Sequence, residues 1–194
     1  MKKIVLFLLL LCFGAVVSSL ASCNASTSSV QTDQTVSSPT PQIRALTLVD
    51  WANFTYFSSC YQNTRPFSTR NGQATNDGIH FSVYTVHYGN LTDDQQLQAI
   101  VPYQCVAADA SGVHVFVYTG SAQHPILLAN LPQPDPRGEI ANITSISISH
   151  KQLHLEGMGY SSDAPHCCPD LFVTTDYSWN GKHFVPIRLS ISKR

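Results

Sequence analysis

The chain has 194 residues, of which 43% are hydrophobic and only 12% are charged, about half the charged fraction of an average soluble domain. The 11 Lys and Arg against 12 Asp and Glu give a weak and scattered charge, which excludes the basic footprint of a nucleic-acid-binding protein. The composition also excludes a collagen, a coiled coil, a multi-span membrane protein and a wholly disordered chain, while leaving enough hydrophobic residues for one core.

The amino-terminal segment has the order of a secretory signal peptide. Lys2 and Lys3 precede an apolar run over residues 4–17, which is shorter than the roughly 20 residues needed to cross a bilayer. The segment ends in Leu20-Ala21-Ser22-Cys23, which resembles the lipobox of bacterial lipoproteins. This resemblance implies cleavage after residue 22 and a diacylglycerol on the sulfur of Cys23. An ordinary signal peptide cut after Ala21 or Ser22 is the alternative.

The number of cysteines favours lipidation of Cys23. Cys12 leaves with the signal peptide, so five cysteines remain, and an exported protein with an unpaired thiol is unusual. Assigning Cys23 to lipid leaves an even set: Cys60, Cys105, Cys167 and Cys168. Two or three acyl chains hold a protein firmly at a bilayer. We therefore expect a lipid-anchored protein on the extracytoplasmic side of the cell membrane, with the membrane as its partner and with no nucleic-acid partner.

The segment after Cys23 predicts a tether rather than a fold. Residues 24–42 contain nine Ser or Thr, two Pro and a single charge, so they cannot form a core. A flexible chain of this length has a root-mean-square reach of about 25 Å. We expect residues 1–22 to be the signal peptide, residues 23–42 the lipidated tether, and residues 43–194 a single β-rich domain.

The folded part shows the alternation of β-strands in chain order. Apolar and β-branched residues predict strands at residues 79–88, 99–105, 113–117, 126–131, 145–149 and 153–156. Turn dipeptides such as Asn71-Gly72, Asp77-Gly78 and Asn180-Gly181 separate strand-like runs. Only residues 46–53 and 93–98 resemble helical turns. The sequence predicts a mainly β fold, with an antiparallel sheet forming a sandwich or partly closed barrel and one or two short helical turns.

The last hairpin allows a prediction of register. A three-residue loop at Trp179-Asn180-Gly181, with Gly181 in the left-handed region, pairs Val173 with Ile187 and Thr175 with Val185. This register collects apolar residues on one face and sends polar residues to the other: Asp176, Ser178, Arg188 and Ser190. Pro186 removes one ladder donor, so the final strand is expected at a sheet edge.

Export makes disulfides the expected state of the four domain cysteines. Of the three possible pairings we favour Cys60–Cys105, which closes a loop of about 46 residues and contributes roughly 4 kcal/mol in the chain-entropy model. It leaves the neighbours Cys167 and Cys168 to each other, and such a bond closes almost no loop. In the alternative pairings each neighbour bonds to a different distant cysteine.

Two carboxy-terminal motifs carry a family resemblance. They are Asp163-Ala164-Pro165-His166-Cys167-Cys168-Pro169 and Tyr177-Ser178-Trp179-Asn180-Gly181. Together they resemble the carboxy-terminal half of the LppP/LprE-type bacterial lipoproteins, with Asp170 where that family has Ser or Thr. The resemblance implies an envelope lipoprotein without an assigned reaction.

Metal sites are only weakly indicated, and we expect no cofactor. His166, the adjacent cysteines and Asp170 are possible ligands, but neighbouring side chains on an extended segment point apart. Asn90, Thr92 and Asp94 resemble a decayed calcium loop that lacks its glycine and closing acid. A polar turn before the strand at residue 99 is the simpler interpretation.

These patterns favour a non-catalytic binding or structural module in the envelope, with no particular ligand assigned. The alternative is an exported enzyme, either metal-dependent through His166 or hydrolytic. A convergent polar pocket would favour the enzyme, and an exposed aromatic patch from Trp51, Tyr56, Phe57 and Tyr61 would favour binding. We expect those aromatic residues to pack beneath the segment around Cys60 instead.

Overall fold

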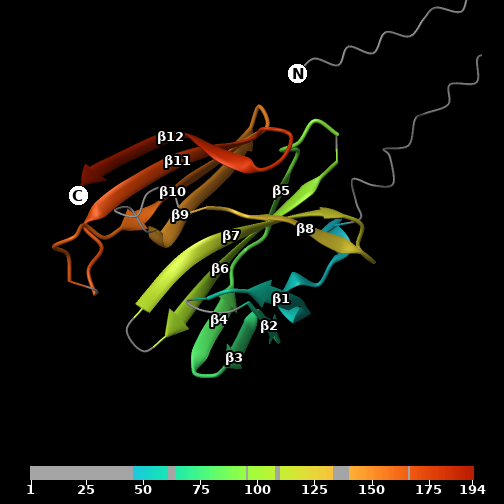
Figure 1. Cartoon of the computed structure of the whole chain (residues 1–194), viewed down its shortest axis with the longest axis horizontal. Helices are drawn as coiled ribbons and strands as arrows, with labels where there is room; N and C mark the ends of the chain where they lie inside the picture. Colours follow the sequence, from blue (N-terminus) through green and yellow to red (C-terminus); the bar gives the residue numbers. More distant parts are fainter. Residues whose placement is uncertain (1–45, 61–63, 95, 108–109, 133–139, 166) are drawn as a thin grey trace, which may run out of the picture. The chain divides into compact units, whose positions relative to one another are not determined.

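The strands of this protein form three antiparallel sheets (Figure 1). The computed structural model describes residues 46–60, 64–94, 96–107, 110–132, 140–165 and 167–194, so the predicted signal peptide and tether lie outside the described residues. Its elements are η2 (Leu46–Leu48), η3 (Trp51–Asn53), β1 (Thr55–Ser58), β2 (Arg65–Ser68), β3 (Gln73–Asn76), β4 (Ile79–Val83), β5 (His87–Gly89), β6 (Gln98–Ala107), β7 (Ala110–Gly120), β8 (Pro125–Asn130), β9 (Ile140–Ser149), β10 (Gln152–Gly159), β11 (Leu171–Trp179) and β12 (Phe184–Lys193).

The largest sheet has β6 and β7 at its centre, in the order β3-β4-β6-β7-β8, and β5 also pairs with β6. Every residue of β6 from Gln98 to Tyr103 is buried. Successive side chains of a strand point to opposite faces, and Val101 and Ile100 belong to two different core clusters. Both faces of this central sheet are therefore covered, which explains why β6 is almost continuously apolar rather than alternating.

One face of the central sheet packs against β1, β2 and the two 3-10 turns through an aromatic core. The rings of Tyr103 and Phe116 stack with their centroids 4.1 Å apart, and those of Phe67 and Phe81 with theirs 4.8 Å apart. Ring pairs at such distances add to the stabilisation from burial alone.

The residues before Cys60 join this aromatic core. Trp51 and Tyr56 are buried, and the Tyr56 hydroxyl donates to the Trp51 carbonyl at 2.5 Å. For these two residues the expectation that the aromatic side chains pack beneath the Cys60 segment is confirmed. For Phe57 it is wrong, because 58% of that residue's surface is exposed, and Tyr61 lies outside the described residues.

The other face of the central sheet packs against a four-stranded sheet in the order β12-β11-β10-β9. Leu153 and Leu155 of β10 and Tyr177 of β11 share a core cluster with Val115 and Val117 of β7. The Tyr177 hydroxyl donates to the Pro132 carbonyl at 2.6 Å and so ties this sheet to the segment after β8. The antiparallel, sandwich-like prediction is confirmed.

Element boundaries differ from the predictions in three places. Residues 93–94 form a turn and Gln98 begins β6, so the helical turn expected over 93–98 is wrong, while η2 and η3 confirm the one at residues 46–53. The strand expected over 79–88 is two strands, β4 and β5. Strands β1, β2 and β3 were not predicted, because each has four residues and at most two of them are buried.

The register predicted for the last hairpin is wrong. Thr175 pairs with Leu189 and Val173 with Ile191, and a register shift follows Asp176. The Asn180 side chain accepts hydrogen bonds from the backbone N–H groups of Lys182 and His183, which stabilises a longer loop than expected. The positive φ of Gly181 and the edge position of β12 are confirmed. Arg188 and Ser190 are exposed as predicted, but Asp176, which lies opposite Arg188, is buried.

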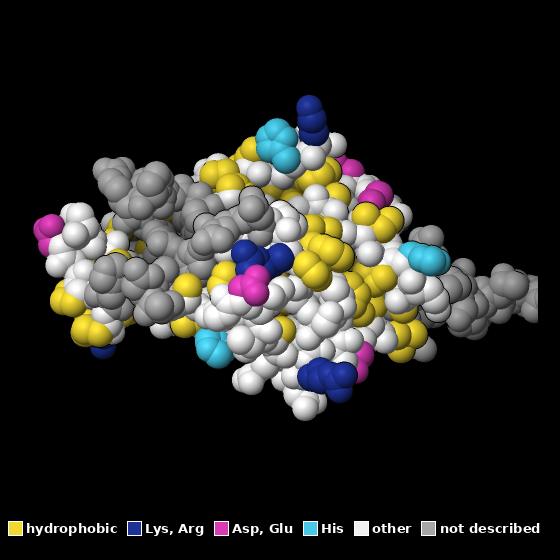
Figure 2. Space-filling model, turned by 60° about the horizontal axis from the view of Figure 1, so that its bottom comes forward, with side chains coloured by type: hydrophobic (Ala, Val, Ile, Leu, Met, Phe, Trp, Pro, Cys, Tyr) yellow, Lys and Arg dark blue, Asp and Glu magenta, His cyan; other side chains and the backbone are white. Residues whose placement is uncertain are grey.

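Charged side chains are sparse on the surface, as the composition predicts. In Figure 2 they lie scattered among uncharged polar atoms and hydrophobic side chains. Across the described ranges, no helix is long and apolar enough to cross a membrane.

Candidate functional site

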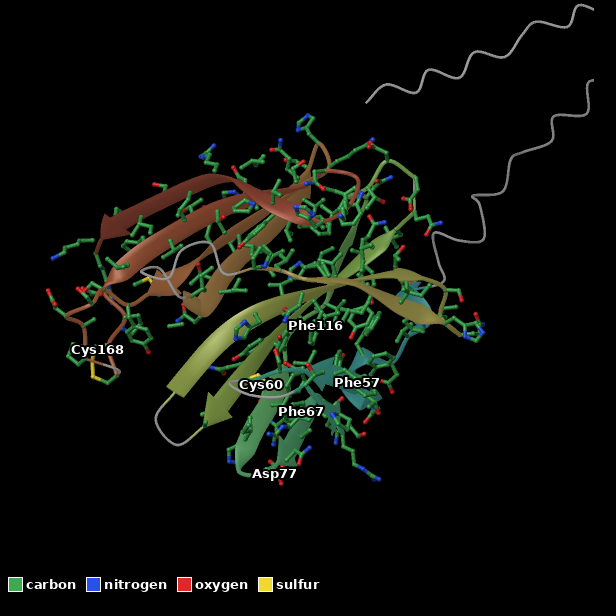
Figure 3. All side chains as sticks on the ribbon, viewed as in Figure 1. Phe57, Cys60, Phe67, Asp77, Phe116 and Cys168 are labelled. Atoms are coloured by element: carbon green, nitrogen blue, oxygen red, sulfur yellow. A yellow bond between two sulfur atoms is a disulfide. The ribbon has the colours of Figure 1, made fainter. Side chains whose placement is uncertain are left out.

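The first predicted site residues to consider are the cysteines. Cys60 is bonded to Cys105, which confirms the favoured pairing, and Cys167 is bonded to Cys168. Cys23, the predicted lipidation site, lies outside the described residues. Figure 3 shows Cys60 near β1 and Cys168 in the connection between β10 and β11, so the two disulfides serve different parts of the fold.

The Cys60–Cys105 disulfide joins two layers. Cys60 follows β1, Cys105 lies in β6, and both are buried with their Cα atoms 5.9 Å apart. The Ser58 hydroxyl lies 3.3 Å from the Cys60 sulfur and 3.3 Å from the Tyr103 hydroxyl. The Cys60–Cys105 bond is therefore a structural crosslink within the aromatic core.

Asp170 stabilises the connection that holds the second disulfide. Its carboxylate accepts hydrogen bonds from the backbone N–H of Ser161 at 2.8 Å and from the Ser161 hydroxyl at 2.7 Å. These bonds hold the pKa of the Asp170 carboxyl below its ordinary value. The residue therefore closes the base of the β10–β11 connection. His166, its suggested companion as a metal ligand, lies outside the described residues.

Asn90 and Asp94 belong to a polar turn organised by the buried Gln98. The Gln98 Oε1 atom accepts a hydrogen bond from Leu91 N at 2.7 Å, and its Nε2 atom donates to the Thr92 hydroxyl at 2.9 Å. That hydroxyl donates in turn to Asp94 Oδ1, which Gln96 N also contacts at 3.1 Å. The Asn90 Oδ1 atom is buried and accepts no hydrogen bond. The predicted turn is confirmed.

Metal-ligating side chains do not gather elsewhere in the described part of the chain. No group of three or more His, Cys, Asp or Glu residues is placed there so that it could hold an ion.

One concave site is a cleft between the central sheet and β9, which we call the sheet cleft. It has a volume of about 280 Å³, close to the lower end of ligand pockets. Its floor is apolar, from Pro102 of β6 and Val113 of β7. The walls carry mostly polar residues and come from the β4–β5 connection, the first residue of β5, and β9: Tyr84, Thr85, His87, Asn142, Ile143, Thr144, Ser145 and Ile146. None of these lining residues is Asp, Glu, Lys or Arg.

Tyr84 is the most distinctive group at this cleft. Its ring is 47% exposed, and its hydroxyl donates to Gln104 Oε1 at 2.5 Å while Gln104 Nε2 donates to the Ser111 hydroxyl at 2.7 Å. Burial raises the pKa of the Tyr84 phenol above its ordinary value, so the group stays protonated and keeps donating. The backbone N–H of Tyr84 also donates to the Pro102 carbonyl at 2.9 Å. A ligand would meet an aromatic face whose orientation is already fixed.

A β-bulge shapes the opposite wall. Ser145 pairs with Glu156 and Ile143 with Gly157, so Thr144 is left without a partner in β10. A bulge re-aims side chains locally, and here both Thr144 and Ser145 line the cleft. Hydroxyl-bearing residues thus line the cleft together with Tyr84.

The sequence did not reveal this cleft. Residues 79–88 read as one strand, whereas the chain breaks after Val83 and exposes Tyr84 between β4 and β5. The one sequence feature that pointed to the cleft was the aromatic residue Tyr84 within this predicted strand. The bulge at Thr144 could not be predicted, because the Ser and Ile alternation that follows it is regular.

A histidine between two carboxylates is the main titratable cluster on the four-stranded sheet. His154 Nδ1 lies 2.5 Å from Asp176 Oδ1, His154 Nε2 lies 3.2 Å from Glu156 Oε1, and Arg188 Nε lies 3.6 Å from Asp176 Oδ2. Hydrogen bonding to Asp176, and then to Glu156, raises the pKa of the His154 imidazole.

Ser147 of β9 lies directly opposite His154, and a serine beside a histidine is the pair that a hydrolytic nucleophile requires. Both ring nitrogens, however, lie within hydrogen-bond distance of carboxylates, so neither is directed at the serine as a general base. The sheet cleft does not include these residues. The cluster is therefore best described as an ion-pair network on the surface of the sheet.

No protein-family model, curated protein or solved structure matches this chain.

Proposed function

We propose that this protein is a lipid-anchored envelope lipoprotein of the LppP/LprE type and that its β domain is a non-catalytic binding module. The lipobox-like Leu20-Ala21-Ser22-Cys23 supports the anchor, together with the basic and apolar segment before it. The pairing of all four remaining cysteines also supports an oxidising compartment, because cytosolic thiols stay reduced.

The sheet cleft carries the binding part of the proposal, and its chemistry indicates a neutral, hydroxylated ring such as a sugar unit of an envelope glycan. The oriented Tyr84 ring offers a face for stacking. Hydroxyl and amide groups of Thr144, Ser145 and Asn142 supply hydrogen-bonding partners. The absence of Lys, Arg, Asp and Glu from the lining disfavours a charged ligand.

The anchor is tested by intact mass spectrometry of the mature protein isolated from its native membrane. The expected mass corresponds to a chain that starts at Cys23 and carries acyl chains, with four cysteines oxidised. A Cys23→Ser variant should lack the lipid and leave the membrane fraction. An unmodified Cys23, or a retained leader, would contradict the anchor without bearing on the cleft.

Binding is tested by NMR titration of the folded protein with triacetylchitotriose, a soluble neutral glycan. We expect saturable shifts that a Tyr84→Ala variant weakens about tenfold, the effect of losing roughly 1.4 kcal/mol of ring stacking. Phe57→Ala is the matched control, because Phe57 is also an exposed ring but lies on β1. Equal losses in both variants would refute a specific site at Tyr84.

A further inference from the structure

A second pocket, which we call the disulfide pocket, lies where the β10–β11 connection meets the four-stranded sheet. Its volume is about 470 Å³. Its lining comes from three strands, the connection and the last residue described: Asn142, Met158, Cys167, Cys168, Pro169, Phe172 and Arg194. The sheet cleft and the disulfide pocket share only Asn142.

The floor of the disulfide pocket interrupts a polar surface. Met158 and Phe172 are direct cross-strand partners, and Phe172 is 49% exposed. Residues at alternate positions along the same two strands share their face, and those are polar: His154 and Glu156 on β10, and Thr174 and Asp176 on β11. A large exposed ring on an otherwise polar face indicates a contact surface rather than a core position.

The Cys167–Cys168 bond forms a rigid wall beside this floor. Both residues are exposed, unlike Cys60 and Cys105, and a bond between neighbours closes too short a loop to stabilise the fold much. The Cys168 N–H also donates to the Pro165 carbonyl at 2.9 Å, and Pro169 follows directly. Such restraints reduce the ordering that a ligand must otherwise impose on binding.

The polar groups at this pocket are donors. Asn142 Oδ1 accepts a hydrogen bond from Met158 N at 3.1 Å, which leaves the Asn142 amide NH₂ to donate. Arg194 is held by its backbone N–H, which donates to the Asp170 carbonyl at 2.9 Å, and its guanidinium makes no ion pair with any described residue. No Asp or Glu is among the lining residues. A guanidinium and an amide beside an apolar floor suit the two oxygens of a carboxylate attached to a ring.

We propose that the disulfide pocket binds a small aromatic carboxylate, with the ring on Met158, Phe172 and the disulfide and the carboxylate at Arg194 and Asn142. This site goes beyond the proposed function: it is a second site, for a charged ligand, on a different part of the sheet.

The test compares 2-naphthoate with its neutral analogue 2-naphthamide in NMR titrations of the folded protein. We expect 2-naphthoate to bind saturably and about fivefold or more tightly than the amide, as a charge-assisted hydrogen bond requires. Phe172→Ser should weaken both ligands about tenfold, since it removes the ring contact. Arg194→Gln should abolish the preference for the carboxylate while leaving the amide unchanged.

Matched controls separate this site from general effects. Phe57→Ser and Arg188→Gln remove another exposed ring and another guanidinium, and both should bind 2-naphthoate as the native protein does. A double Cys167→Ser and Cys168→Ser variant should fold and should bind 2-naphthoate severalfold more weakly. This variant tests the contribution of the disulfide wall independently of Phe172.

The proposal is overturned if the chemical-shift changes caused by 2-naphthoate do not saturate. It is equally overturned if the Phe172→Ser variant and the double Cys167→Ser and Cys168→Ser variant both bind 2-naphthoate as tightly as the native protein does. It is also overturned if Tyr84→Ala, at the sheet cleft, removes naphthoate binding while Phe172→Ser preserves it. Triacetylchitotriose binding in the Phe172→Ser variant reports on the sheet cleft independently, so failure of one site is distinguishable from failure of the other.

Discussion

The two disulfides should differ greatly in their contribution to stability. Cys60 and Cys105 are 45 residues apart in sequence, and the entropy of closing a loop of that size corresponds to about 4 kcal/mol at 25 °C. Cys167 and Cys168 are one residue apart, and the same relation gives about 1 kcal/mol for so small a loop. We therefore expect a difference of about 3 kcal/mol between the two double-alanine variants.

Burial acts in the same direction as loop entropy. Cys60 and Cys105 lie in the aromatic core, where alanine leaves unfilled volume, whereas Cys167 and Cys168 are exposed. Loss of the buried bond also frees the layer of β1 and β2 from β6 at its carboxy-terminal end. For a domain of this size, about 4 kcal/mol corresponds to a fall in Tm of roughly 8–16 °C.

The assay is urea unfolding of the mature domain, followed by far-ultraviolet circular dichroism, for the native protein and both double variants. Each free energy of unfolding is compared at a common m value, because a changed m would signal an altered denatured state. Equal losses in the two variants, or a larger loss for the Cys167 and Cys168 pair, would refute the assignment of the first bond as the crosslink that holds the layers.

Two further substitutions probe the four-stranded sheet. Gly157→Ala should lower the free energy of unfolding by about 2 kcal/mol or more in the same urea assay, because its Cβ would lie 2.2 Å from the Asn142 carbonyl oxygen. Ser149→Ala, at an exposed position of β9, is the control. A loss for Gly157→Ala as small as that of the control would contradict the clash. His154→Gln should lower the free energy of unfolding by up to about 1 kcal/mol near pH 5.5 and by less near pH 8.5. The pKa of His154 is raised in the folded state, so the imidazole stabilises the fold at pH values below its ordinary pKa of about 6.5. This stabilisation is lost as the pH rises through the folded-state pKa. A cost that grows with pH would show that the cluster does not hold a protonated ring.

Strand identity was predictable where side chains alternate over many residues. The Ser and Ile alternation of 145–149 and the Val residues of 113–117 each predicted a strand that the structure contains. The short strands β1 to β3 were not predictable, because each has only four residues and its pairing depends on tertiary packing rather than on a local pattern.

The faces of the last hairpin were predicted only in part. Beyond the register shift after Asp176 the assigned faces agree with the pairing, with Thr175 opposite Leu189. Nearer the loop Val185 lies opposite Ser178 instead of Thr175, so the two faces of β12 are exchanged there. The pairing of the hairpin depended on the loop, where Asn180 accepts two backbone hydrogen bonds, and on a shift after Asp176. Neither feature is specified by the hydrophobic pattern, so the pattern alone favoured a shorter loop.

The disulfide-bonded cysteines could be predicted from the sequence, whereas the two pockets could not, because the pockets depend on local irregularities of strand pairing. Both pockets have a wall on β9, and β9 departs twice from regular pairing with β10: Thr144 is unpaired in one shift and Ala141 in the other. A single inserted residue turns the following side chains to the opposite face, and a second restores the alternation. The two shifts bracket Asn142, which lines both pockets. Since β9 is also an edge strand, the two bulges that shape the pockets also hinder pairing with another chain.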